Sequence, residues 1–286
     1  MKFTKMHGCG NDYIYVDGQK EQIAPEEKPG VVRFLSDRHF GVGGDGVIFI
    51  NPSSEADFEM EMYNADGSRA EMCGNGIRCV AKYVYDKGLT DKEEFTIVSA
   101  GMRKQISLTV KEGKAAAARV NMGRPELAVE KIPVISKEKQ VIDEEILVEG
   151  KPYRMTCVSM GNPHAVVFME DVKHMRIEEI GPSFENHPRF PKRINTEFVR
   201  VIDRHNVEMR VWERGTGETL ACGTGCCATA AACVLNGLTD RKVTVHVPGG
   251  SLLIEWNEKE DTIYMTGPAE TVFEGEIDAG ILPVVN

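Results

Sequence analysis

The sequence predicts an α+β protein of two pseudo-symmetric domains, each a β-sheet or barrel wrapped around a central α-helix. Three observations predict this fold: an internal repeat, strand-like alternation in both halves, and one Gly-rich helix start in each half. The chain has 286 residues, which is enough for two domains of about 140 residues each.

The internal repeat relates two long segments of the chain. MYNADGSRAEMCGNGIRCVAKYV in the first half matches VWERGTGETLACGTGCCATAAACV in the second without a gap, which places Cys73 on Cys222, 149 residues apart. The segments around Asn11 and Asn162 also match, as do NMGRPEL and MTGPAET further along. Three matches in the same order indicate two copies of one unit. We expect domains at 1–130, joined by the tail 275–286, and at 131–274, with the connection within 132–150.

The strands and helices of each copy are read from periodicity. Residues 58–67 and 205–215 alternate as half-buried strands do. Helices are predicted at roughly 75–87 and 224–236, and Gly88 and Gly237 end them. The second helix is almost wholly apolar and small, so it should be buried in its own sheet. Further strands are expected at FTIVSA, KQISLTV, ARVNMG, KVTVHV, SLLIEW and TIYMTG.

Composition excludes several classes of partner. Lys and Arg number 34 against 44 Asp and Glu, and the net charge of −10 argues against nucleic acid and anionic membrane surfaces. No stretch approaches the roughly 18 apolar residues of a membrane span, and no apolar signal core follows the basic start. We therefore expect a cytoplasmic protein that binds neither nucleic acid nor a membrane.

The eight cysteines are not arranged as metal ligands or as a disulfide framework. They lack repeated CxxC pairs at finger spacing, and Cys222, Cys226 and Cys227 have no histidine near them in sequence. No metal is expected. No lysine typical of pyridoxal phosphate enzymes and no dinucleotide loop is evident, since GVGGDG at 41–46 lacks the strand–helix context, so no cofactor is expected.

Cys73 and Cys222 stand at helix starts, where chemistry is favoured. Free N–H groups and the helix dipole favour an anion there, so we expect a stabilised thiolate with a lowered pKa. The same N–H groups can hold a substrate carboxylate. Two such cysteines in related units favour a two-base inversion of a carbon centre, with one thiolate removing a proton and the opposite thiol supplying one.

Each of the candidate residues also has a purely structural interpretation. A single cysteine is more often a buried small hydrophobe than a catalytic group, and we read Cys79, Cys157 and Cys233 in that way. A lone His164 would be read as a satisfied core histidine, and Glu213 as a solvated strand end. The shared glycines and matched positions of Cys73 and Cys222 favour chemistry for that pair.

The sequence resembles the diaminopimelate epimerases over essentially its whole length. The resemblance is carried by HGCGNDYI, RHFGVGGDG, NADGSRAEMCGNGIRC, GNPH, Asn195 with Glu197, and ERGTGETLACGTG. It implies the cofactor-independent interconversion of LL- and meso-diaminopimelate in lysine and peptidoglycan precursor biosynthesis, by a homodimeric enzyme.

The resemblance implies roles for particular residues. Cys73 and Cys222 would be the acid–base pair, tuned by His164 and Glu213. The residues implied in binding a diamino dicarboxylate are Asn11, Asn64, Gly74, Asn75, Asn162, Asn195, Glu213, Arg214, Gly223 and Thr224. Arg214 is a natural bidentate partner for the distal carboxylate.

Two positions depart from the family pattern. Some members have a glutamine at Gly46 that reaches the substrate, so this contact must be lost here or replaced by backbone. A tyrosine often supports the dimer at Phe273, and phenylalanine keeps the ring without the hydroxyl.

Two other functions remain open at this point. A proline or hydroxyproline racemase of the same fold is disfavoured by Asn64, Asn195 and Arg214, because its substrate has no distal carboxylate. A thiol redox protein would instead use Cys73 and Cys222 as a regulatory disulfide.

Overall fold

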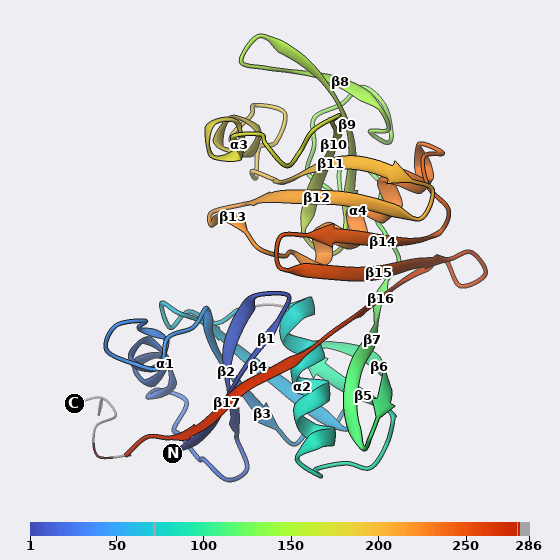
Figure 1. The fold of residues 1–286 in the computed structure, drawn as a ribbon. Coiled ribbons are helices and arrows are strands. Elements are labelled where there is room, and N and C mark those ends of the chain that lie inside the picture. Colours follow the sequence, from blue (N-terminus) through green and yellow to red (C-terminus); the bar gives the residue numbers. More distant parts are fainter. Residues whose placement is uncertain (71–72, 279, 281–286) are drawn as a thin grey trace. The chain divides into compact units, whose positions relative to one another are not determined.

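The computed structural model describes residues 1–70, 73–278 and 280, and Figure 1 shows its strands and helices. The chain divides into two compact units, Met1–Val120 with Gly267–Asn286, and Asn121–Thr266. These boundaries lie earlier than those expected from the sequence. Glu126 already pairs with Ser159 of the second unit, and the strand at 270–276 pairs with the N-terminal strand of the first. The part of the expected tail at 281–286 lies outside the described residues.

The first unit is a mixed sheet with two helices. Strand β1 pairs with β2 and with β17, and the sheet continues from β2 through β3, β4, β5 and β6 to β7. Its strands are β1 (Lys2–Gly8), β2 (Asn11–Asp17), β3 (Gly46–Asn51), β4 (Phe58–Asn64), β5 (Glu94–Ser99), β6 (Met102–Lys111), β7 (Lys114–Gly123) and β17 (Glu270–Glu276), and its helices are α1 (Lys28–Ser36) and α2 (Gly74–Asp86).

The second unit repeats this plan. Its sheet runs from β8 through β9, β10, β11 and β12 to β14, β15 and β16, with short β13 beside β12. The strands are β8 (Glu144–Val148), β9 (Lys151–Ser159), β10 (Pro163–Phe168), β11 (Asn195–Asp203), β12 (Asn206–Glu213), β13 (Gly217–Thr219), β14 (Lys242–Val247), β15 (Gly250–Asn257) and β16 (Thr262–Gly267), and the helices are α3 (Ile177–Glu185) and α4 (Gly223–Leu235). Residues 132–150, expected to connect the units, lie within this one.

The order of strand directions confirms the predicted repeat. From β1 to β7 the successive pairings are antiparallel, parallel, antiparallel, parallel, antiparallel and antiparallel. From β9 to β16, leaving out β13, they follow the same series. The two-domain α+β fold predicted from the sequence is therefore present.

Helices α2 and α4 are the central helices of the two units, and each has 13 residues. Both end in the same way: the N–H of Gly88 bonds to Tyr85 and that of Leu89 to Val84, which is a Schellman motif. Gly237 and Leu238 repeat it, and both glycines have positive φ, near 70°. The predicted helix ends are confirmed.

A second helix in each unit was missed by the sequence analysis. Helix α1 begins with Lys28-Pro29-Gly30, and α3 contains Gly181-Pro182, residues that weaken a helical pattern. Helix α1 packs on the face of β3 that carries Val47 and Phe49, while Ile48 on the other face meets α2. Each sheet thus has apolar packing on both faces.

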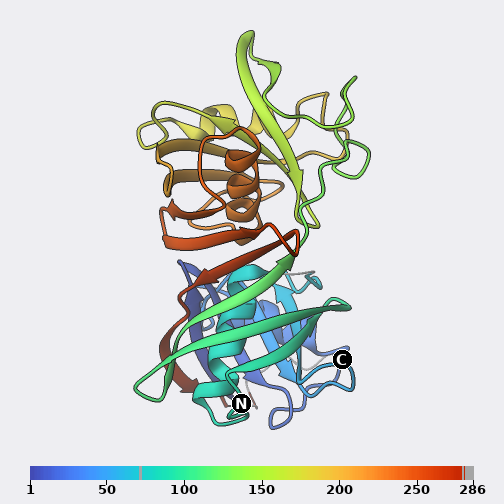
Figure 2. The same cartoon turned by 90° about the vertical axis from the view of Figure 1, so that its right-hand side faces the viewer.

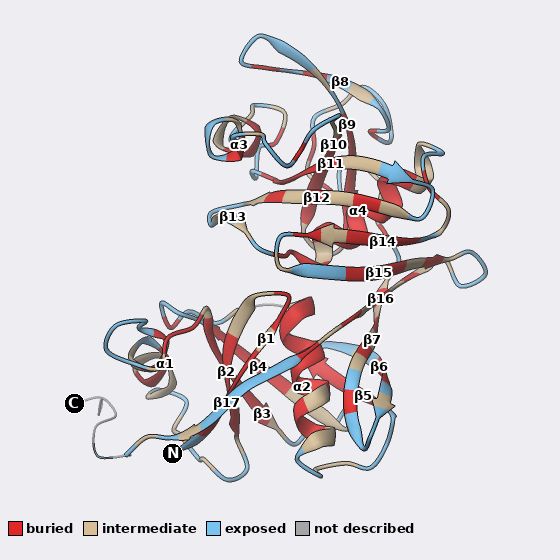
Figure 3. Cartoon of the chain, in the orientation of Figure 1, coloured by how far each residue is buried: buried red, intermediate tan, exposed pale blue. Residues whose placement is uncertain are grey.

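Burial follows this arrangement. Figure 3 shows most of α4 in the colour of buried residues, and Figure 2 shows it running beside the strands of its own unit. Its residues from Gly225 to Cys233 are all buried, as its apolar sequence predicted. Among the described residues, no helix is long and apolar enough to cross a bilayer.

Candidate active site

Cys73 and Cys222 are the N-cap residues of α2 and α4. Both have extended backbone angles, with φ and ψ of −123° and 114° for Cys73 and −117° and 110° for Cys222. Each Sγ accepts a hydrogen bond from a backbone N–H three residues later, from Gly76 or Gly225, at 3.3 Å. A cysteine therefore does here what Ser, Thr or Asp usually does, and the sulfur is fixed at the positive end of the helix.

In the first unit, two amide side chains surround Cys73. Asn11, at the start of β2, has its Oδ1 3.2 Å from Sγ of Cys73 and 3.4 Å from Nδ2 of Asn75. Buried Arg78 donates from Nη1 to Gly74 O and from Nη2 to Asn75 Oδ1, both at 3.0 Å. Four of the residues implied by the family resemblance thus lie together.

An acidic residue from the 37–45 loop orients Asn11. Oδ2 of Asp45 accepts from Asn11 Nδ2 at 2.7 Å and from the backbone N–H of Asp12 at 3.1 Å. Arg38 donates to Asp45 at 2.9 Å and to Asp12 at 2.8 Å. Because Asp45 takes the amide hydrogens of Asn11, the amide oxygen is turned toward Cys73. This loop carries part of the family resemblance, but no role was assigned to Asp45 from the sequence.

Asn64 and Gly46 lie on neighbouring strands. They are register partners in β3 and β4, and the exposed Asn64 side chain donates to Ser68 at 3.0 Å. A Cβ added at Gly46 would lie 2.0 Å from Tyr63 O, so this backbone accommodates no side chain there. The absence of a glutamine at this position therefore has a steric reason.

In the second unit, His164 on β10 lies between two side chains. Its Nδ1 is 2.7 Å from Oε1 of Glu197, and its Nε2 is 2.9 Å from Oδ1 of Asn162. Both His164 and Glu197 are fully buried. The second oxygen of Glu197 has no hydrogen-bond partner within the described part of the chain. Glu197 is one of the residues that carry the family resemblance, but no role was assigned to it from the sequence.

Asn195 and Arg214 form a second polar group. Asn195 donates to Pro163 O at 2.8 Å and accepts from the backbone N–H of Arg214 at 2.9 Å. The guanidinium of Arg214 is exposed and donates to the Lys192 carbonyl at 3.2 Å. It has no carboxylate partner among the described residues, so its donors remain available to an anion.

The expected lowering of the thiol pKa is wrong for Cys222. Burial raises its pKa well above the ordinary value, and the nearby carboxylates Glu213 and Glu197 add to this. Hydrogen bonds from Thr224, 3.4 Å away, and from the N–H of Gly225 act in the opposite direction and do not outweigh it. Glu213 ends β12 and accepts from the hydroxyl of Thr219. Burial and these carboxylates therefore favour the thiol form of Cys222.

Cys79, Cys157 and Cys233 are buried, as predicted. Burial raises the pKa of the Cys79 and Cys233 thiols to about 12, and it raises that of Cys157 as well. Within the described structure none of the eight cysteines is in a disulfide. The described residues contain no cluster of three or more His, Cys, Asp or Glu side chains that could hold a metal ion.

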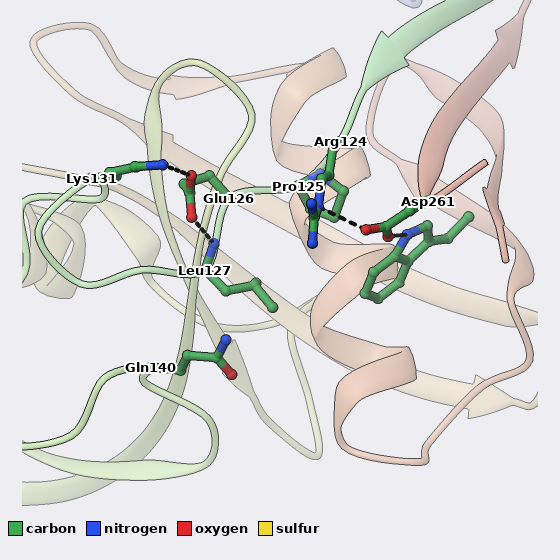
Figure 4. Close-up of a pocket in the computed structure, with 8 residues that line it drawn as sticks. Arg124, Pro125, Glu126, Leu127, Lys131, Gln140 and Asp261 are labelled. Carbon is green, nitrogen blue, oxygen red and sulfur yellow. Dashed lines mark hydrogen bonds and ion pairs between the residues drawn. The ribbon is translucent and has the colours of Figure 1, made fainter. Parts of the chain in front are cut away.

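A separate hollow lies in the second unit (Figure 4). Its volume is about 260 Å³, and it is lined by residues of 124–140 together with Trp256 and Asp261. Its charges pair with each other: Arg124 bonds Asp261 at 2.7 Å, and Lys131 bonds Glu126 at 2.9 Å. None of the residues expected at the active site lines it.

Comparison with known proteins places these features in one family. A model of the family described as diaminopimelate epimerase matches residues 3–128 and 156–272. A diaminopimelate epimerase of Methanococcus maripaludis is 58% identical over 278 residues, covering 97% of this chain and all of that one. One of Acetivibrio thermocellus is 55% identical, covering 97% and 99%.

Solved structures share the fold at low identity. A hydroxyproline epimerase from Agrobacterium vitis has a TM-score of 0.69 at 15% identity, with 96% of this chain and 91% of that chain covered. A Bacillus anthracis phenazine biosynthesis protein of the PhzF family has a TM-score of 0.68 at 17% identity, with 97% and 98% covered. These likenesses establish the fold, and the sequence match to the two epimerases establishes the family. The chain belongs to the diaminopimelate epimerase family of isomerases.

Proposed function

We propose that this chain interconverts LL- and meso-2,6-diaminopimelate without a cofactor, on the route to lysine and peptidoglycan precursors. The observation that carries the proposal is the repeated cysteine N-cap. Cys73 and Cys222 occupy the same position of two repeat-related helices, and each sulfur accepts the same backbone hydrogen bond. A chemistry that needs two equivalent groups explains why both copies kept the cysteine.

The reaction that fits is inversion of the α-carbon. One cysteine, as thiolate, removes the α-proton and becomes a thiol, while the other, as thiol, delivers a proton to the opposite face and becomes a thiolate. The net result is inversion, with one thiol and one thiolate before and after. The negative charge that develops on the substrate carboxylate is stabilised by helix-start N–H groups, those of Gly74, Asn75, Gly223 and Thr224.

The polar residues of each unit support a substrate with two charged ends. Exposed Arg214 supplies paired donors for a distal carboxylate, and the amides of Asn11, Asn64, Asn162 and Asn195 supply neutral acceptors for the amino groups and donors for the carboxylates. A proline-type substrate has no distal carboxylate for Arg214 to bind. We therefore favour diaminopimelate over the rival racemase reaction.

We also propose a cytoplasmic homodimer. The absence of disulfides among the described cysteines suits a reducing compartment. On β17 the side chains of Val272 and Phe273 are 55% and 45% exposed, and the Phe273 ring packs edge-on against Phe3 at 5.9 Å. Exposed aliphatic and aromatic groups on a strand are typical of a surface that another subunit covers.

The proposed reaction is tested by following solvent deuterium into the α-carbon of diaminopimelate. The wild-type chain should incorporate deuterium and equilibrate the two stereoisomers, and Cys73→Ser and Cys222→Ser should each lose the interconversion. Cys233→Ser is the matched control, because Cys233 lies in the same helix as the Cys222 cap and is fully buried. Full interconversion by either of the first two variants would exclude the two-thiol mechanism, whereas turnover of proline instead would exclude the substrate. Activity that persists after Cys73 and Cys222 are oxidised would count against both the diaminopimelate and the proline-type reaction.

A further inference from the structure

The two central helices begin alike but rest on different residues. A Cβ added at Gly76 of α2 would lie 2.8 Å from Cδ1 of Ile48, on β3. A Cβ added at Gly225 of α4 would lie 2.6 Å from Oε1 of Glu197, on β11. Ile48 and Glu197 are 149 residues apart, so they occupy equivalent places in the repeat. An aliphatic group meets one helix start and a carboxylate meets the other.

This carboxylate is close to the Cys222 sulfur. The same point at Gly225 lies 3.3 Å from Sγ of Cys222, so the carboxylate oxygen and the sulfur are within the roughly 6 Å over which like charges disfavour each other. Gly225 at the start of α4 donates its N–H to the sulfur, and the Glu197 oxygen lies against the same residue. A negative charge on Glu197 therefore competes with a thiolate on Cys222.

Several groups face these two residues. His164 bonds to Oε1 of Glu197, while Cys157 on β9 contributes only a buried thiol. Glu213 and the hydroxyl of Thr224 face Cys222. Within the described structure His164 thus bonds one oxygen of the Glu197 carboxylate, and the other oxygen stays unbonded there.

The first unit has the opposite charge near its cysteine. Arg78, fully buried, donates to the carbonyl of Gly74, the residue after Cys73. Its repeat equivalent is Cys227, which is uncharged and buried. A cation near a helix start favours a thiolate, and a carboxylate there favours a thiol.

We propose that Glu197 is a positioning residue that acts through the start of α4 to favour the thiol form of Cys222, so that the two repeat-related cysteines are unequal acids. Cys73 is then the stronger acid and carries the thiolate of the resting pair. His164 takes part by holding the Glu197 carboxylate against Gly225. The consequence for turnover rests on the proposed function, but the titration of Cys222 does not.

The test measures the thiolate of Cys222 without any substrate. The background variant is Cys73→Ser, and the thiolate ultraviolet absorbance that disappears on adding Cys222→Ser is assigned to Cys222. Glu197→Gln keeps the size of the side chain and removes its charge. In this variant the titration midpoint of Cys222 should fall by about one pH unit. The Cys222 thiolate is then about tenfold more abundant at pH values below both midpoints.

Thr196→Val is the matched control. Thr196 is the neighbour of Glu197 on β11, is fully buried, points to the opposite face and has an unbonded hydroxyl among the described residues. It should leave the Cys222 midpoint unchanged. An unchanged midpoint in Glu197→Gln, or an equal shift in Thr196→Val, would overturn the proposal.

A second variant covers a failure to fold. Glu197→Ile installs the residue that the first unit uses at the equivalent place, and it should lower the midpoint as Gln does. If neither variant folds, Glu197 serves the structure and the proposal is wrong. If the wild-type chain does not epimerise diaminopimelate but Glu197→Gln still shifts the midpoint, the proposed function fails and this inference stands.

Discussion

Replacing Asp45 by Asn tests whether the 37–45 loop controls the amide of Asn11. In the structure Asp45 accepts both the Asn11 amide hydrogen at 2.7 Å and the Asp12 N–H at 3.1 Å, which leaves the Asn11 oxygen facing Cys73. An asparagine at 45 can present its own hydrogens instead, and the Asn11 amide can then turn over. When Cys73 is in its thiol form, as it must be to deliver a proton, its S–H would then lose its acceptor, while the fold is kept.

The expected size of this effect comes from one hydrogen bond to a charged group. Such bonds contribute about 1.5–3 kcal/mol, and the Asp45 side chain is 39% exposed, which favours the lower end. A loss of about 1.4 kcal/mol corresponds to about tenfold in kcat/KM for diaminopimelate. Asp57→Asn is the control, because Asp57 lies in the same unit and pairs with Lys92 instead.

A double-mutant cycle decides whether Asp45 acts through Asn11. If it does, adding Asp45→Asn to Asn11→Ala should cost no further activity, giving a coupling of about 1.4 kcal/mol. An undiminished tenfold loss in the Asn11→Ala background would refute the reasoning, since Asp45 would then act by another route. Thermal unfolding of all four proteins separates lost activity from lost fold.

Three further outcomes follow from the structure. Asp57→Asn should lower Tm at pH 7, because hydrogen bonds from Lys92 and the Thr96 N–H lower the pKa of Asp57 from 3.8 to about 2. The carboxylate therefore stabilises the fold above pH 3.8, and the Tm difference between wild type and variant should close as the pH falls from 3.8 toward 2. Ala231→Leu should lower the free energy of unfolding by about 1–3 kcal/mol in a urea titration, since Ala231 is fully buried in α4; no loss would show that the helix has spare room. Arg214→Met should raise KM for diaminopimelate about tenfold with a smaller change in kcat, and an unchanged KM would mean that the distal carboxylate binds elsewhere.

The repeat made much of the fold predictable. A constant offset between two cysteine motifs is a long-range signal, and it fixed both central helices and their glycine ends within a residue or so. Helices α1 and α3 carry no such signal. Their Pro and Gly residues oppose a helix locally, and only packing on the sheet, as of Val31 and Leu35 in α1, stabilises them.

The sequence predicts a set of site residues, but it does not predict their electrostatic environment. The cysteine positions follow from the motif, whereas the pKa of Cys222 depends on burial and on Glu197, which reaches it from another strand. The one clue in sequence was Glu197 beside the apolar pair Phe198 and Val199 in β11. A charged residue in such a strand deserved a functional reading, because full burial of an acid needs a specific partner.

The pairing of β1 with β17 has a consequence for the order in which the protein is made. The second unit is one continuous stretch, Asn121–Thr266, and all of it leaves the ribosome before β17 does. Most of the first unit is synthesised earlier, but one edge of β1 stays unpaired until residues 270–276 emerge. The later half of the chain is therefore expected to mature first, and the nascent first half is the one that needs a chaperone.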